Sequence, residues 1–170
     1  MQRKMFCFQC EQTAGCSACA GNAGVCSKKA DTAELQDKLT GALIGLARAT
    51  ESNENLVNEN TDRLVLKGLF TTITNVNFNN EAITALIERV EAEKERFVSK
   101  YPRCSSACGR NDNYNMNDLW NAQEDIRSLK SLILFGIRGV ACAFLSRIKK
   151  VFSFKRQFRY CLAESAKRIC

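Results

Sequence analysis

The sequence predicts an all-α protein in which a cysteine-rich loop precedes a bundle of three or four helices. Proline occurs only once, at Pro102, so long stretches of the chain contain no helix breaker. Apolar side chains recur at helical spacing in four segments. The first 30 residues hold five cysteines and few large apolar side chains, so this part needs something other than a core to order it.

The helical segments are expected at about 32–49, 61–74, 81–99 and from about Asn117 through Val140. The first follows Asp31-Thr32-Ala33-Glu34, a capping-box pattern that uses aspartate, and Asn80 is expected to cap the third. Polar connections are expected between them, at 52–60, 74–80 and 101–115. The last connection contains Cys104 and Cys108, which are expected to be ordinary loop thiols.

Composition places the chain among globular proteins. It has 170 residues, of which 45% are hydrophobic and 25% charged, which suits one domain with a core. The N-terminus lacks the apolar stretch and cleavage site of a signal peptide, so we expect a cytoplasmic protein whose cysteines stay reduced. The longest apolar stretch, 129–145, is interrupted by charged residues and is too short to predict a membrane span.

The net charge of +7 belongs to the C-terminal tail alone. Residues 145–170 hold eight basic residues and one acidic residue, and the rest of the chain is neutral. Aromatic residues interleave with these basic residues, a pattern that fits a nucleic-acid or anionic surface. The simpler interpretation is a surplus helix without function, because the imbalance is confined to the tail. We therefore do not expect nucleic acid as a partner.

The N-terminal cysteines form the candidate metal site. The chain has no histidine, so a metal must be held mainly by sulfur. Cys7 and Cys10 are separated by two residues, and Cys19 and Cys26 follow in the same loop. Four thiolates suit either a tetrahedral zinc ion or an iron–sulfur cluster, and their spacing alone does not decide between them. Backbone N–H groups of the loop glycines could approach cluster sulfides; these glycines are Gly15, Gly21 and Gly24.

Five stretches of the chain resemble one known family. Residues 5–14 read MFCFQCEQTA and residues 24–29 read GVCSKK. Further similarity lies in LQDKL at 35–39, TITNVNF at 72–78 and DIRSLKSLILFGIRG at 125–139. Together they resemble the start of the hybrid-cluster proteins, the prismane family, also called hydroxylamine reductases. The resemblance covers about residues 5–143.

The resemblance implies a cofactor and its ligands. It assigns the four cysteines to a [4Fe–4S] cluster rather than the [2Fe–2S] cluster of some members, because the gap after the second cysteine is short. The implied ligands are Cys7, Cys10, Cys19 and Cys26, with Cys16 as the alternative to Cys19. Ser27 departs from the family, which usually has glycine there, and this change is harmful if its φ is positive.

The resemblance also implies what this chain lacks. Family members are much longer and bind a hybrid cluster, which reduces hydroxylamine, in later domains. We therefore divide the chain into a cysteine-rich iron–sulfur loop at 5–30, a helical bundle at 31–143 and a divergent basic tail at 144–170. The abrupt change near residue 143 is typical of a truncated or frameshifted product, with a short protein that has its own tail as the alternative.

Two functions follow as hypotheses. The first is the electron-transfer part of a hydroxylamine reductase, inactive alone and served by a ferredoxin-like or NADH-linked donor, with missing domains or another subunit supplying the catalytic cluster. The second is a helical binding protein stapled by zinc, whose basic tail contacts nucleic acid.

Overall fold

The protein is described here from a computed structural model. The structure describes residues 5–7, 18–51, 54–73, 77–100 and 113–145. In these ranges the elements are α1 (Ala30–Glu51), a short 3-10 helix η2 (Glu54–Leu56), α2 (Glu59–Thr71), α3 (Asn80–Lys100), α4 (Met116–Trp120) and α5 (Glu124–Leu145). Strand-like pairing among the described residues is limited to two isolated bridges. The predicted all-α fold is confirmed.

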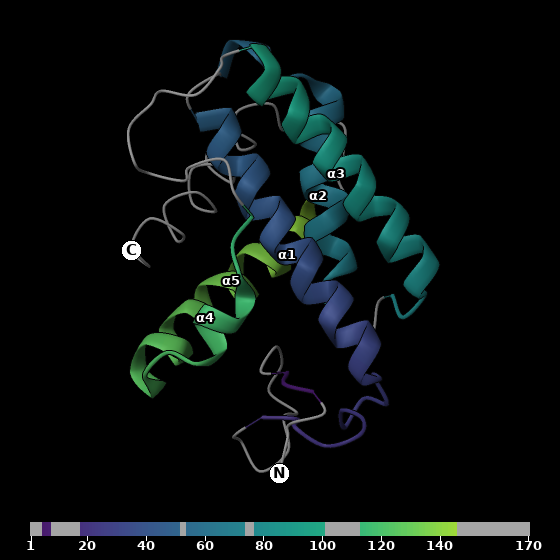
Figure 1. Cartoon of the computed structure of the whole chain (residues 1–170), viewed down its shortest axis with the longest axis vertical. Coiled ribbons are helices and arrows are strands. Elements are labelled where there is room, and N and C mark those ends of the chain that lie inside the picture. The colour runs from purple at the N-terminus through teal and green to yellow at the C-terminus, as the bar shows by residue number, and fades with distance from the viewer. Residues whose placement is uncertain (1–4, 8–17, 52–53, 74–76, 101–112, 146–170) are drawn as a thin grey trace.

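Helices α1, α2 and α3 form an up-down-up bundle in which α1 and α3 run side by side (Figure 1). The N-terminal ends of α1 and α3 meet. The Thr32 hydroxyl donates to the Asn80 side-chain oxygen over 2.8 Å, and the Asn80 amide donates to Asp31 over 2.9 Å. Helix α5 then packs mainly against α2. The cysteine-bearing segments lie at the end of the bundle where α1 begins (Figure 1).

The predicted caps of α1 and α3 are wrong, because both residues lie inside the helices that they were expected to precede. Helix α1 begins at Ala30, so Asp31 lies inside the first turn. Helix α3 begins at Asn80, and it is Asn79 whose side chain accepts from the Ala82 N–H over 3.0 Å. Asn79 therefore satisfies one of the unpaired donors of the helix start. Asn80 instead links the two helices.

The predicted single helix beyond Asn117 is also wrong, because α4 and α5 are separate. Asn121 ends α4, and its N–H donates to the Asn117 carbonyl over 2.9 Å. The Gln123 carbonyl accepts from the Arg127 N–H over 2.8 Å and so starts α5. A continuous apolar period conceals such a break, since both helices bury their apolar faces against the same core.

The core lies between α1, α2, α3 and α5 and extends to α4. Trp120 is buried within it, as predicted. The indole N–H of Trp120 donates to the Asp37 carboxylate over 2.8 Å, which gives the buried ring the polar partner it needs. Its other buried members are apolar residues of all five helices together with Tyr114.

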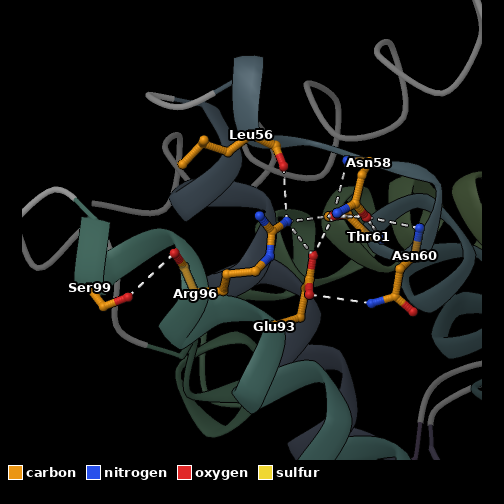
Figure 2. A network of polar contacts seen from close by, with 7 residues as sticks. All are labelled: Leu56, Asn58, Asn60, Thr61, Glu93, Arg96 and Ser99. Carbon is orange, nitrogen blue, oxygen red and sulfur yellow. Dashed lines mark hydrogen bonds and ion pairs between the residues drawn. The ribbon is translucent and has the colours of Figure 1, made fainter.

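A polar network joins the start of α2 to α3 (Figure 2). Asn58 caps α2 in a capping box with Thr61. The Glu93 carboxylate accepts from the Thr61 hydroxyl, from the Asn60 amide over 3.3 Å and from the Arg96 guanidinium over 2.7 Å. Figure 2 shows the Glu93 and Arg96 side chains converging on this cap. A buried carboxylate with three donors fixes α2 against α3.

Helix α5 leaves part of its apolar surface uncovered by the described residues. Large hydrophobic side chains are exposed along it, with Leu129 and Leu132 exposed by 60% and 66%. Four further large apolar side chains of α5 are exposed: Ile126, Ile133, Phe135 and Val140. None of the helices in the described ranges combines the length and apolar character that crossing a membrane requires.

Candidate metal centre

Two of the predicted ligand cysteines lie opposite each other in a backbone bridge. The Cys7 N–H donates to the Cys19 carbonyl and the Cys19 N–H donates to the Cys7 carbonyl, each over 2.9 Å. Such a hydrogen-bonded antiparallel pair points both side chains to one side, with Cβ atoms typically about 5 Å apart. Both cysteines are buried and form a small cluster with Met5 and Ala33. Two residues that are twelve apart in sequence thus point their side chains to the same side of the bridge.

Phe6 fixes this bridge to the helices. Side chains alternate along extended backbone, so Phe6 points away from its neighbours Met5 and Cys7. Its ring lies against the Trp120 ring, with centroids 5.2 Å apart, and the Arg127 guanidinium lies 5.6 Å from the Phe6 centroid. The loop is therefore anchored at α4 and the start of α5.

A tight turn positions the fourth predicted ligand, Cys26. The Ser27 N–H donates to the Gly24 carbonyl over 2.9 Å, and the Gly24 N–H donates to the Lys28 carbonyl over 2.8 Å. A Cβ atom placed on Gly24 would lie 3.5 Å from the Cys26 sulfur and 3.8 Å from the Cys19 sulfur. These two sulfurs therefore both lie within 4 Å of one point beside Gly24.

Ser27 adopts the backbone conformation that the sequence argument identified as harmful. Its φ is 65°, in the left-handed region. In three-residue hairpin loops a left-handed residue follows the turn and is usually glycine. For a residue with a Cβ atom this conformation costs about 1–2 kcal/mol. The chain therefore carries local strain next to Cys26.

Replacing Ser27 with glycine is expected to stabilise the protein by about 0.5–1 kcal/mol. Relief of the left-handed strain exceeds the extra chain entropy that glycine adds to the unfolded state. The free energy of urea-induced unfolding measures the change. Ser128→Gly, at an exposed position in α5, is the matched control and should destabilise the protein by up to about 1 kcal/mol. An equal loss of unfolding free energy in the two glycine variants would contradict the strain at Ser27.

One buried cation, Lys28, lies beside Cys7, and a second buried cation, Arg138, interacts electrostatically with it. Lys28 is fully buried, and its Nζ lies 3.8 Å from the Cys7 sulfur. Arg138 of α5 donates to the hydroxyls of Thr72 and Thr40 over 2.8 and 2.9 Å. Burial lowers the pKa of Arg138 to about 10, and the charges of Asp37 and Cys7 oppose this shift. Arg138 therefore stays charged at neutral pH, and a thiolate at Cys7 has positive charge nearby.

Sequence reasoning missed both cations. It also expected the Gly24 N–H to approach cluster sulfides, which is wrong because that N–H bonds to the Lys28 carbonyl. Within the described ranges no group of three Cys, Asp or Glu side chains is placed to hold a metal ion. Four cysteines of the sequence argument lie outside these ranges, as does Gly15: Cys10, Cys16, Cys104 and Cys108.

The donor chemistry of the described part fits a thiolate-ligated centre. Cys7, Cys19 and Cys26 form no disulfide. Cys7 and Cys19 are adjacent and buried, Cys19 and Cys26 share the space at Gly24, and Lys28 supplies a compensating charge. Buried thiolates need such compensation, and iron–sulfur sites depend on it.

A model of the prismane/CO dehydrogenase family matches residues 5–158. The chain belongs to this family. The match includes all five α-helices and continues beyond residue 143, where the basic tail was predicted to begin. The predicted boundaries of loop, bundle and tail remain predictions, and residues 146–170 lie outside the described part of the chain.

Among its relatives in the prismane/CO dehydrogenase family are three proteins named hydroxylamine reductase. That of Methanocella arvoryzae is 38% identical, over 88% of this chain and 33% of the relative. That of Clostridium perfringens is 33% identical, over 97% of this chain and 33% of the relative. That of Solidesulfovibrio magneticus is 36% identical, over 81% of this chain and 28% of the relative. The chain thus spans about a third of the length of these relatives.

Proposed function

We propose that the chain is the iron–sulfur electron-transfer part of a hydroxylamine reductase. Cys7, Cys10, Cys19 and Cys26 would hold a [4Fe–4S] cluster, which supplies a one-electron redox centre when bound. The observation that carries the proposal is the buried Cys7–Cys19 pair, whose backbones bond to each other twice. This pairing also supports Cys19, rather than Cys16, as the third ligand.

The described residues would perform three tasks in this function. The Cys7–Cys19 bridge and the turn at Cys26 would hold the backbones that carry these sulfurs in place around a metal. The contact between the Phe6 and Trp120 rings would attach the site to the helices and so fix the position of Cys7 relative to them. Burial of Cys7 and Cys19 keeps water away from two of the sulfurs, which favours thiolate–metal bonds over exchange with solvent.

Reduction of hydroxylamine is proposed to need polypeptide other than this chain. The relatives named hydroxylamine reductase are about three times as long. The uncovered apolar face of α5 supports contact with such polypeptide, whether further domains or another subunit, because exposed apolar patches often mark interfaces. A ferredoxin-like protein or an NADH-linked reductase would donate electrons. The reduced cysteines suit the cytoplasm, where we place the protein.

Anaerobic purification followed by iron, sulfide and zinc analysis tests the proposed cofactor. About four irons and four sulfides per chain are expected. Stoichiometric zinc without sulfide would overturn the proposal and favour the zinc-stapled binding protein. Hydroxylamine turnover by the purified chain alone would overturn the proposal that this reaction needs other polypeptide.

Single serine variants identify the ligands. Cys7→Ser and Cys19→Ser are expected to lose most of the iron. Cys108→Ser is the control and should retain it, since the family motif does not include this thiol. Loss of iron in Cys16→Ser together with full iron in Cys19→Ser would replace Cys19 by Cys16 in the ligand set.

A further inference from the structure

Lys28 is an unusual residue to find at the centre of a cysteine loop. Lysine is rarely buried completely, because removal of its charge from water is costly. Lys28 is nevertheless fully buried, and its ammonium group lies 3.8 Å from the Cys7 sulfur. Its neighbour Lys29 is exposed. The sequence thus places two adjacent lysines in opposite environments.

The turn at Cys26 determines which lysine points inward. The Lys28 carbonyl accepts from the Gly24 N–H, and Lys29 pairs with Ala23 in a short antiparallel bridge. Successive side chains of extended backbone point to opposite sides, so Lys28 faces Cys7 while Lys29 faces solvent. The backbone of Lys28 is therefore held by the turn, which limits how far its ammonium group can move from the Cys7 sulfur.

A second cation acts on the same sulfur from the helical side. Arg138 is buried in α5, and its charge interacts with that of Cys7. Lys28 of the loop thus lies next to one predicted ligand, and Arg138 of α5 adds a second positive charge that interacts with it. Both are shielded from water, so salt screens their fields less than it screens surface charges. The sulfur of Cys7 is in an electropositive environment.

We propose that Lys28 raises the reduction potential of the site by holding a positive charge against the Cys7 ligand. This inference rests on the proposed function, since it requires a cluster at Cys7. In the step concerned, one electron arrives from an external donor and the site becomes one unit more negative. No bond forms or breaks and no proton moves. A nearby positive charge favours the more negative, reduced state.

The test is an anaerobic redox titration of the full chain with dithionite, followed by electron paramagnetic resonance, after iron has been measured in each variant. Lys28→Met removes the charge and keeps a side chain of similar length. At a fixed solution potential, the ratio of reduced to oxidised site is expected to fall about tenfold, equivalent to about 59 mV for one electron. Lys28→Arg, which keeps the charge, should remain within about threefold of the wild type.

Lys29→Met is the matched control, because it removes the same charge from the adjacent, exposed position. Its ratio should stay within about twofold of the wild type, since water and salt screen an exposed charge. If Lys28→Met binds iron normally and titrates like the wild type, the inference is overturned while the proposed function stands. Absence of iron and sulfide from the wild type would instead overturn the proposed function.

Lys28→Gln provides a second neutral variant if Lys28→Met fails to retain iron. It keeps a hydrogen-bond donor near Cys7 and therefore separates charge from hydrogen bonding. A tenfold fall in the ratio supports the role of charge. An unchanged ratio overturns it, as would loss of iron from both neutral variants, because Lys28 would then be needed for assembly rather than for the potential.

Discussion

Replacing Gly41 with alanine is expected to destabilise the protein by about 2–3 kcal/mol, although the same change in a helix interior usually stabilises. A Cβ atom on Gly41 of α1 would overlap with the Tyr114 carbonyl oxygen. The Tyr114 N–H also donates to the Gly41 carbonyl over 3.2 Å. Both contacts are with backbone, which cannot rotate away as a flexible side chain can. The gain in helix propensity, about 1 kcal/mol, is smaller than the cost of overpacking.

Gly136→Ala and Gly139→Ala are the matched controls for this change. Both glycines lie inside α5, and a Cβ atom there would meet nothing within 4 Å. They should therefore stabilise the protein by up to about 1 kcal/mol, the opposite sign to Gly41→Ala. Urea unfolding of the three variants measures the difference. A Gly41→Ala variant as stable as the controls would contradict the close approach of Tyr114 to α1.

The same substitution should weaken the candidate metal centre. Tyr114 leads directly into α4, which ends at Trp120, and Trp120 packs against Phe6 beside Cys7. Displacement of this segment from α1 would loosen the anchor of the cysteine loop. Gly41→Ala is thus expected to lower the iron content as well as the stability, whereas the two α5 controls should leave the iron content unchanged.

The helices could be predicted from the sequence because each buries one apolar face. The period of 3.6 residues is visible wherever a helix packs on one side, and the three first helices lie within about three residues of their predicted bounds. Trp120 could be predicted as a core residue for the same reason. The break at Asn121 could not, since α4 and α5 continue one apolar pattern across it.

Features that depend on partners distant in sequence were not predictable. Nothing in the segment around Gly41 indicates that Tyr114 approaches it. Lys28 and Lys29 look alike in sequence, and only the turn at Cys26 separates them. Arg138 offered a weak signal, because it lies four residues after Leu134 and three before Ala141, on the buried face of α5. A charged residue at such a position indicates a buried polar contact.

Replacing Glu93 with glutamine is expected to lower the free energy of unfolding by about 2 kcal/mol at pH 7. Glutamine has about the same size but loses the charge and one acceptor oxygen. Arg96 would lose its ionic partner, and the donors of Thr61 and Asn60 would compete for the remaining oxygen. Glu95→Gln, at an exposed position of the same helix, should change the stability by less than about 0.5 kcal/mol.

The contribution of Glu93 to the free energy of unfolding should also depend on pH. Burial raises the pKa of Glu93, but the hydrogen bonds from Arg96, Thr61 and Asn60 and the charge of Arg96 together lower it below its ordinary value of 4.5. A carboxyl group whose pKa is lower in the folded state stabilises folding fully at pH values above the unfolded pKa. That contribution is lost as pH falls through the folded pKa.

The stability difference between wild type and Glu93→Gln should therefore be constant from pH 7 to about 5.5 and shrink below pH 4.5. Urea unfolding at pH 7, 5.5, 4 and 3 measures it, with Glu95→Gln followed over the same range. A difference that stays constant down to pH 3 would mean that the carboxylate charge contributes nothing. In that case the cap at Asn58 would hold α2 against α3 through neutral hydrogen bonds alone.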